Sequence, residues 1–362
     1  MRRASPTPMR RSSRSSACDP MSTTPAPRVA ESAPPVRRVV GLALLAGGLV
    51  AAIIASIIFG SQSLPLTDVW HGLLGADTEA GVIVREMRIP RTVIALAVGA
   101  ALGVAGALIQ AFSRNPLADP GILGVNAGAS AGVVFAVAFL GASGVFQYIW
   151  FAFAGAIAAT LLVFLIGAAG RGDADPLRMT LAGVALGAVL SGITGGIALL
   201  RSDVFDTIRT WTVGSLQSLT SDVFGVLPFL VIGLIIAFWL APSMNALALG
   251  DDLATALGTR VGLTRVLSIV AVALLCGAAT AAAGPIGFVG LMVPHAVRWL
   301  VGPHQVWIMA GTVLAAPLLL LVSDVVGRLV LPSGELPVAL VTAFIGAPVL
   351  IVLVRARKAS SL

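Results

Sequence analysis

The stretch "TVIALAVGAALGVAGALIQAFSRNPLADPGILGVNAGAS" (residues 92–130) contains a long apolar run, a polar break and the beginning of a second apolar run. A helix needs about 20 mostly apolar residues to cross a bilayer, and the first run has this length. The break brings an arginine, an asparagine, an aspartate and two prolines together within a few residues. Alternating runs and breaks of this kind are typical of a protein that crosses a membrane repeatedly.

The composition of the whole chain supports this class. Apolar residues make up 57% of the chain and charged residues 11%, whereas about a quarter of the residues in a soluble domain are charged. The strands of a membrane barrel alternate polar and apolar side chains, and these runs do not alternate. We therefore predict an all-α polytopic membrane protein.

Apolar runs separated by polar breaks predict ten membrane-spanning helices. They are expected near residues 39–60, 91–111, 121–140, 149–169, 179–200, 224–241, 264–283, 285–298, 305–324 and 336–354. Arginines gather before the first run, and Arg355, Arg357 and Lys358 follow the last one. Since basic residues beside spans mark the cytoplasmic side, both termini are expected in the cytoplasm. The segments 61–90 and 201–223 are then external loops.

Residues 1–38 are rich in arginine, serine and proline and have almost no apolar content. Such a segment cannot bury a core, so we predict a disordered cytoplasmic tail before a transmembrane domain at residues 39–362. An arginine- and serine-rich leader also resembles an organellar transit peptide. Met9 and Met21 are alternative starts of the chain.

Ionisable residues are almost absent from the centres of the predicted spans. Ion-coupled carriers usually hold such residues inside the membrane as a relay, so their absence weighs against a secondary transporter. It also weighs against a polytopic enzyme, and no catalytic residue is predicted. The histidines His71, His295 and His304 lack the spacing of a metal site. We expect neither a metal nor a cofactor on this chain.

ATP hydrolysis by this chain is excluded by its lack of a P-loop. The motif G-x-x-x-x-G-K-[ST] needs a lysine that reaches the phosphates, and the only lysine is Lys358, which no glycine precedes. ATP would therefore act through a partner. The basic residues lie beside spans rather than in a patch for nucleic acid, so membrane lipid is the expected neighbour.

The polar break predicts a tight reversal between two spans. Asn115-Pro116 is expected to end the first helix, because the residue before a proline avoids helical angles. Asp119, Pro120 and Gly121 are typical of a turn, since proline suits its second position and glycine its third. This explains the residue types but not why these ones are combined.

Small residues recur at every fourth position in two of the predicted spans. They are Gly124, Gly128 and Gly132 in one span, and Gly183, Gly187, Ser191 and Gly195 in another. Small residues at this spacing let helix backbones approach closely in lipid, and the residues themselves favour this packing role. The alternative is that the stripe lines a pathway wide enough for a bulky solute.

The segment "MNALALGDDLATALG" (residues 244–258) predicts a short cytoplasmic helix. Asp251 can cap its N-terminus, Asp252 is favourable to the helix dipole, and Gly258 suits a C-terminal stop. The candidate contact residues are Leu249, Gly250, Asp251, Asp252, Leu253, Ala256, Leu257 and Gly258; residues 253, 256 and 257 fall on one face. Such a face fits a groove on a partner protein, or it lies on the lipid surface.

Three arginines lie at the outer ends of predicted spans. Arg88 and Arg91 flank a proline, and Arg328 follows Asp324 by four residues. The simpler interpretation is anchoring at the membrane interface together with an Asp–Arg pair on one helix face. The alternative is docking of an acidic partner, because arginine pairs bidentately with carboxylates.

Six segments in order resemble one family. "RIPRTVIALAVGAALGVAGALIQAFSRNPLADPGILGVNAGA" (residues 88–129) resembles the signature region of the FecCD-type permeases, the membrane subunits of bacterial ABC importers for iron–siderophores, heme and vitamin B12. Further resemblances are "LAGVALG" at 181–187, "WTVGSL" at 211–216, residues 244–258, "GPIGFVGLMVPHAVR" at 284–298 and "ELPVALVTAFIGAPV" at 335–349. Together they cover the chain from about residue 40 to its end.

The resemblance implies a type II ABC importer fold with ten spans and alternating access. It implies two permease subunits side by side, two cytoplasmic ATPases that bind ATP and Mg²⁺, and a periplasmic or lipid-anchored substrate-binding protein. The location would be the bacterial cytoplasmic membrane. Iron–siderophore is the expected cargo, with vitamin B12 or heme as alternatives, and an ion-coupled secondary carrier is the rival from another class.

The resemblance also implies roles for individual residues. The helix within 244–258 would dock into the ATPase, and Arg88, Arg91 and Arg328 would meet acidic residues on the binding protein. The pathway would be lined by the span that contains Gly183, Gly187, Ser191 and Gly195. The cytoplasmic gate would lie in the preceding turn, at Pro176 and Leu177, where the vitamin B12 permease carries small hydroxyl residues instead.

Overall fold

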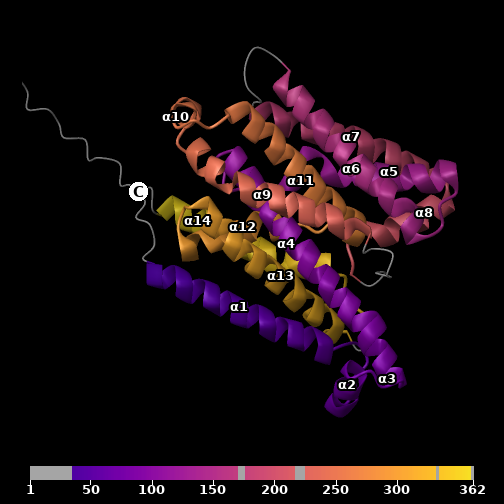
Figure 1. Ribbon diagram of the computed structural model, residues 1–362. Helices are drawn as coiled ribbons and strands as arrows, with labels where there is room; N and C mark the ends of the chain where they lie inside the picture. Colours follow the sequence, from indigo (N-terminus) through magenta and orange to yellow (C-terminus); the bar gives the residue numbers. More distant parts are fainter. Residues whose placement is uncertain (1–34, 170–175, 217–224, 332–333, 360–362) are drawn as a thin grey trace, which may run out of the picture. The chain divides into compact units, whose positions relative to one another are not determined.

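The computed structural model describes residues 35–169, 176–216, 225–331 and 334–359, and within these ranges it contains helices and no strands (Figure 1). The predicted tail lies outside the described residues up to position 34. Residues 35–38 are an exception to the tail prediction, because they form the first turn of helix α1. The boundary at residue 38 was therefore wrong by about one helical turn: charged side chains at a helix end do not stop the helix.

Ten longer helices occur among the described residues. They are α1 (Pro35–Ile58), α4 (Ile89–Phe112), α5 (Val125–Leu140), α6 (Val145–Ala168), α7 (Pro176–Leu200), α9 (Leu227–Leu247), α11 (Val261–Ala283), α12 (Val289–Val301), α13 (Gln305–Leu329) and α14 (Val338–Ala359). Each predicted span overlaps one of them. Seven of the described helices are long and apolar enough to cross a membrane, whereas the apolar parts of α5, α12 and α14 are shorter. The chain is therefore a multi-pass membrane protein.

Short helices occupy several segments that the sequence analysis treated as loops. They are α2 (Leu66–Leu73), α3 (Glu79–Val82), the π-helix η1 (Ile83–Arg88), the 3-10 helix η2 (Pro120–Leu123), α8 (Ser202–Trp211) and α10 (Asp251–Ala256). Of these, only α10 was predicted. The others are too short, or too polar, for the hydropathy signal that marks a membrane span.

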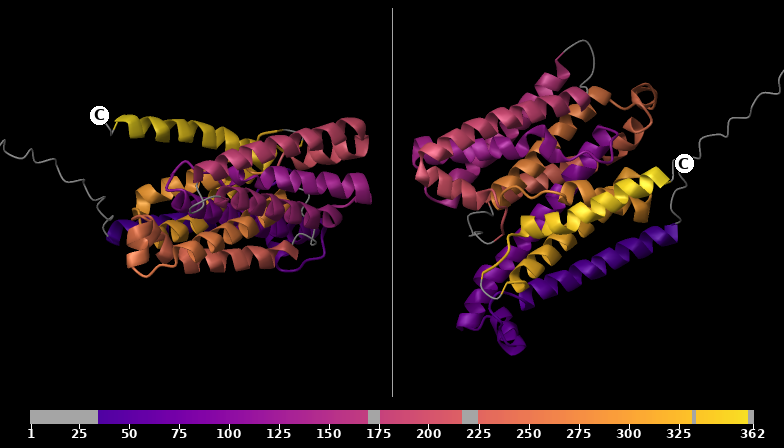
Figure 2. Two further views of the ribbon diagram at one scale, coloured as in Figure 1. Left: turned by 90° about the horizontal axis from the view of Figure 1, so that it is seen from above. Right: turned by 180° about the vertical axis from the view of Figure 1, so that it is seen from behind.

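The helix α4 lies at the centre of the packing, and most of its side chains are buried. It packs against α9, α11, α12 and α13. The helices α5, α6 and α7 pack against one another on the side away from α1 (Figures 1 and 2). The helix α10 lies at one end of the bundle, and α2 and α3 lie at the other end.

Glycines on α4 allow its backbone to approach those of its neighbours. A Cβ atom at Gly99 would lie 2.7 Å from the Cα atom of Pro317, and one at Gly106 would lie 1.8 Å from the carbonyl oxygen of Gly290. Close backbone approach between membrane helices depends on such small residues. These positions therefore determine how near α12 and α13 lie to α4.

Replacement of Gly106 by alanine is expected to lower the stability of the subunit by about 1–3 kcal/mol or more, because the new methyl group meets a backbone that cannot move independently. The yield of monodisperse protein in detergent and its melting temperature would report the loss. Gly47→Ala is the matched control, since no heavy atom lies within 4 Å of a Cβ at that position. Equal melting temperatures for the two variants would contradict the packing argument.

Candidate functional site

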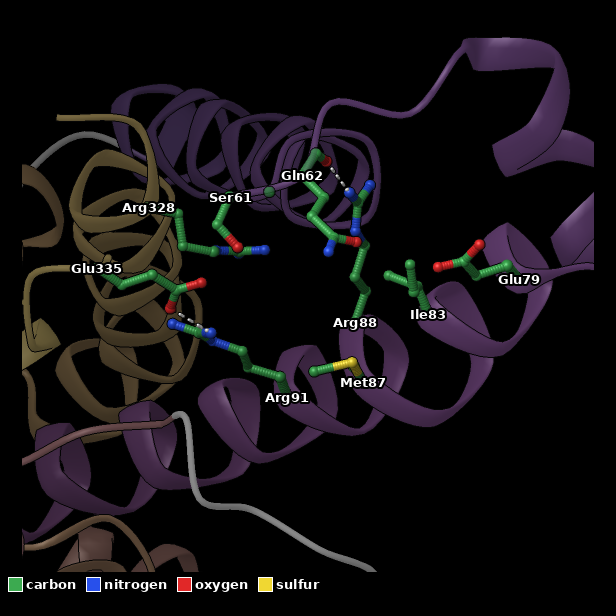
Figure 3. A pocket seen from close by; sticks show the side chains of 10 residues that line it. Ser61, Gln62, Glu79, Ile83, Met87, Arg88, Arg91, Arg328 and Glu335 are labelled. Atoms are coloured by element: carbon green, nitrogen blue, oxygen red, sulfur yellow. Dashed lines mark hydrogen bonds and ion pairs between the residues drawn. The ribbon is translucent and has the colours of Figure 1, made fainter. Parts of the chain in front are cut away.

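The three arginines that the sequence analysis singled out converge on one pocket, where the C-terminal ends of α1 and α13 meet the N-terminal end of α4. Figure 3 shows Arg88, Arg91 and Arg328 around this pocket, together with Gln62 and Glu335. The volume of the pocket is about 270 Å³. Residues from three distant parts of the sequence therefore form one polar surface feature.

Two of these arginines bind the C-terminal end of α1. Arg88 donates from Nη1 to the carbonyl oxygens of Ile57 (2.8 Å) and Ile58 (2.7 Å), and Arg328 donates from Nη1 to those of Ser56 (3.0 Å) and Phe59 (2.9 Å). The last carbonyls of a helix have no partner within the helix, and a cation is favourable there. Both arginines are 4% exposed. They therefore hold the end of α1 against α4 and α13, a role that the sequence analysis missed.

The third arginine, Arg91, joins α4 to the buried Asp324 on α13 and to Glu335 in the segment before α14. Its Nη2 lies 2.6 Å from Oδ1 of Asp324, and its Nη1 lies 2.8 Å from Oε2 of Glu335. Asp324 is 1% exposed and also pairs with Arg328 at 2.8 Å, which confirms the predicted Asp–Arg pair on one helix face. An acidic partner that docks here would meet guanidinium groups that already have partners within the chain.

The polar break of the opening stretch forms the predicted turn. The Asn115 side chain accepts from the backbone N–H of Leu117 at 3.0 Å, and the Asp119 side chain accepts from that of Gly121 at 2.7 Å. The 3-10 helix η2 (Pro120–Leu123) follows these two side-chain caps. Burial raises the pKa of Asp119, while the N–H of Gly121 acts in the opposite direction.

The turn has a second property, because it forms one wall of a groove. Its residues Gly121 and Ile122 line this groove with Asn126 and Ser130 of α5 and with Gly183, Val184, Gly187 and Ser191 of α7. The groove has a volume of about 360 Å³. The opening stretch and the small-residue stripe on α7, which are far apart in sequence, therefore meet at one surface.

The small residues differ in how closely they approach neighbouring helices, and Gly183 both packs closely and lines the groove. A Cβ at Gly132 would lie 2.0 Å from the carbonyl oxygen of Phe151 on α6, and one at Gly183 would lie 1.8 Å from that of Ile122. These two positions serve close packing. Ser191 and Gly195 are exposed instead, and no heavy atom lies within 4 Å of a Cβ at Gly195. Close packing is thus confirmed for Gly132 and Gly183, and the pathway interpretation stays a prediction.

The helix α10 lies within the segment 244–258, where the sequence analysis predicted a short helix. Leu253 is 48% exposed and Leu257 is 62% exposed, as is Leu249 just before the helix at 61%. Ala254 is fully buried and anchors the opposite face, and Ala256 is exposed beside the leucines. Gly258 has a φ of +82°, in agreement with the predicted stop.

The predicted cap by Asp251 was wrong. Gly250 is the N-cap residue, with a φ of +111°, and no side chain caps the helix. Asp251 is the first helical residue, and its carboxylate pairs with Arg114 and, at 2.6 Å, with Arg265. Two arginines brought close by the fold attract the carboxylate away from the helix N–H groups; sequence spacing alone gives no sign of them.

The candidate gate residues lie at the start of α7. Pro176 and Leu177 are its first two residues, and the Leu177 side chain is 66% exposed. The turn before them, at residues 170–175, lies outside the described residues. The placement of Pro176 at the first helical position agrees with the preference of proline for the first turn of a helix.

The helix α8 was missed by the sequence analysis, although its pattern carries a signal. Val204, Ile208 and Trp211 recur at helical spacing, and Val204 and Trp211 are buried. Arg201 donates to the carbonyl oxygen of Ala138 at the end of α5 at 2.6 Å. Hydrogen bonds from Arg201 also lower the pKa of Asp203. Amphipathic periodicity over ten residues could have identified this helix.

The described part of the chain contains no group of three or more His, Cys, Asp or Glu side chains that could hold a metal ion. The arrangement thus offers polar and apolar surfaces: the pocket of the three arginines, the groove between the turn and α7, and the exposed face of α10.

Comparisons with known proteins give a consistent result. The sequence pattern of the FecCD transport family matches residues 48–356. The ferric enterobactin transport system permease protein FepD of Escherichia coli (strain K12) is 49% identical over 318 residues, which cover 87% of this chain and 94% of that protein. The cobalamin import system permease protein BtuC of Halobacterium salinarum is 37% identical over 289 residues, which cover 80% and 77%.

A solved structure supports the same grouping. The chain superimposes with a TM-score of 0.76 and 28% sequence identity on a metal-chelate type ABC transporter in an inward-facing conformation. The match covers 88% of this chain and 98% of the other.

Proposed function

The chain belongs to the FecCD transport family, and on this premise we propose that it is the permease subunit of a binding-protein-dependent ABC importer for iron–siderophore. The identity of 49% to a ferric enterobactin permease, against 37% to a cobalamin permease, supports this cargo. The location is the bacterial cytoplasmic membrane, with ten spans and both termini in the cytoplasm. A second permease subunit, either the same chain or a paralogue, completes the membrane part.

One arrangement carries the proposal: an exposed apolar helix lies beside a turn that forms the wall of a groove. The helix α10 presents Leu253 and Leu257 to the outside of the subunit, where a groove on a partner ATPase would receive them. Two such ATPases bind ATP and Mg²⁺, and this chain binds neither. Within the predicted coupling segment Leu249 to Gly258, the exposed leucines form the surface that meets the ATPase. The Asp251 carboxylate instead pairs with Arg114 and Arg265 of this chain.

The groove is the proposed translocation pathway. Gly187, Ser191 and Gly195 lie on a largely exposed face of α7, which a second permease subunit would face across the pathway. Small side chains leave room there for a bulky chelate. Pro176 and Leu177, at the start of the same helix, are the proposed gate.

The pocket of the three arginines, on the proposed outer side of the membrane, is the proposed docking surface for a periplasmic or lipid-anchored substrate-binding protein. Acidic residues of that protein would approach Arg91, whose side chain is 14% exposed, and would compete with Glu335 for it. Arg88 and Arg328 would contribute by holding the end of α1 beneath this surface.

Uptake by cells tests the proposal. Cells that lack this gene are expected to lose uptake of a radioiron–siderophore, and restoration of the gene should recover it. Heme and labelled vitamin B12 are assayed in parallel, and vanadate should inhibit the recovered uptake, since the energy comes from ATP. A defect confined to the uptake of vitamin B12 or heme would change the assigned cargo to that compound. Uptake that vanadate does not inhibit would favour an ion-coupled carrier.

A further inference from the structure

Asp251 connects α10 to two other parts of the chain. Its Oδ1 pairs with Nη2 of Arg114, which follows the end of α4, and its Oδ2 lies 2.6 Å from Nη2 of Arg265 on α11. Arg114 is 137 residues away in the sequence. A single carboxylate at the start of α10 thus holds one arginine on each side.

Arg114 has an unusual backbone conformation that directs its side chain toward α10. Its φ is +50°, in the left-handed region that residues other than glycine rarely adopt. Such a strained conformation persists only when the surroundings enforce it and is a reason to look for a function. The side chain uses this position to donate from Nε to the carbonyl oxygen of Leu247 at 3.0 Å, at the end of α9, while it pairs with Asp251.

Both ion pairs of Asp251 involve arginines on elements that reach Asn126 in the groove wall. Arg114 opens the α4–α5 turn, whose prolines and side-chain caps make it stiff, and Asn126 follows this turn on α5. Arg265 lies near the start of α11, and Thr280 on the same helix donates to the Asn126 side chain at 3.3 Å. Two series of contacts therefore connect α10 with the same groove residue.

We propose that Asp251 is a positioning residue that transmits the movement of α10 to the groove, through Arg114 to the α4–α5 turn and through Arg265 to α11. This inference rests on the proposed function, because it takes α10 as the helix that an ATPase moves. It also explains why the polar break begins with an arginine: the turn needs a charged contact to α10 at one end and groove-lining residues at the other.

If the role of Asp251 were purely structural, removal of its charge would lower uptake and ATP hydrolysis equally. The Asp251 side chain is 34% exposed and that of Arg114 is 46% exposed, and an ion pair this accessible contributes little to stability. The Arg265 side chain is only 14% exposed, and the amide oxygen of an asparagine at position 251 can still accept its hydrogen bond. Removal of the charge should then leave a folded subunit that still binds its ATPase. A transmission role predicts that such a subunit hydrolyses ATP but transports poorly.

The first test uses the complete importer with its ATPase and binding protein in proteoliposomes. Asp251→Asn is expected to lower iron–siderophore uptake at least tenfold while ATP hydrolysis stays within twofold of the wild type. Asp251→Glu should recover much of the uptake, since it restores the charge. Asp77→Asn, which removes an exposed carboxylate from its pair with Arg85, is the matched control and should transport normally. Normal uptake by Asp251→Asn, or an equal loss of uptake and ATP hydrolysis, would overturn the proposal.

A second test does not depend on the cargo. Ser130 lines the groove, and Ser130→Cys combined with Cys18→Ala places a reactive thiol there. The labelling rate of this thiol by a maleimide is measured in the permease–ATPase complex with and without ATP and vanadate. In this background, ATP and vanadate should change the labelling rate. In the same background with Asp251→Asn added, ATP and vanadate should no longer change the labelling rate. If ATP changed the labelling rate of the Asp251→Asn variant as much as before, the inference would be wrong. This outcome does not depend on which cargo the importer carries.

Discussion

Asp324→Ala is expected to reduce the amount of folded subunit in the membrane by at least tenfold. The Asp324 carboxylate is 1% exposed and compensates two guanidinium groups, those of Arg91 and Arg328. Removal of one partner from a buried ion pair costs about 3–5 kcal/mol, because it leaves an uncompensated charge. Here one substitution leaves two arginines without their shared partner, and Arg328 also holds the end of α1.

The measurement is the yield of monodisperse protein after extraction in detergent, together with its melting temperature. Asp324→Asn should be less harmful than Asp324→Ala, because the amide oxygen can still accept a hydrogen bond from an arginine. Asp77→Ala is the control, since it removes a carboxylate that is 98% exposed and pairs with one arginine. A melting temperature of Asp324→Ala equal to that of the control would show that the buried network does not hold these helices together.

Leu253→Asp combined with Leu257→Asp should abolish binding of the ATPase. Both side chains are about half exposed or more in the subunit, so the substitutions should leave its stability nearly unchanged, as surface substitutions usually do. Apolar anchors in the centre of an interface contribute about 2 kcal/mol or more each, which corresponds to roughly a 30-fold change in affinity per residue. Charged side chains at both positions should therefore remove the ATPase and all transport.

Co-purification of the tagged subunit with its ATPase measures this effect directly. Leu74→Asp is the matched control, because Leu74 is 69% exposed and follows α2 at the opposite end of the bundle. Retention of the ATPase by the double variant would place the ATPase contact elsewhere on the subunit.

Much of the fold follows from local properties of the sequence. The apolar runs predicted the positions of ten helices because hydropathy over about 20 residues reports a bilayer-spanning length regardless of what surrounds it. The turn at Asp119 to Gly121 and the stop at Gly258 were predicted for a similar reason, since proline, glycine and side-chain caps act on neighbouring backbone groups. The helix α8 was missed because it has only ten residues and several of them are charged.

The roles of charged residues could not be predicted in this way. Arg91 and Asp324 are 233 residues apart, and an arginine at a helix end has the same local pattern whether it caps another helix or faces solvent. Asp251 illustrates the same difficulty, because its position predicted a helix cap and its actual partners are arginines on two other elements.

The sequence by itself determined the class of protein, the approximate limits of its helices, the main turn and the family. The tertiary structure alone decided which small residues approach a neighbouring backbone and which are exposed, which carboxylate each arginine meets, and which arginines pair with Asp251. The physical reason is range. Hydropathy and backbone preferences act over a few neighbouring residues, whereas an ion pair or a close backbone contact depends on which distant segment the packing places within about 4 Å.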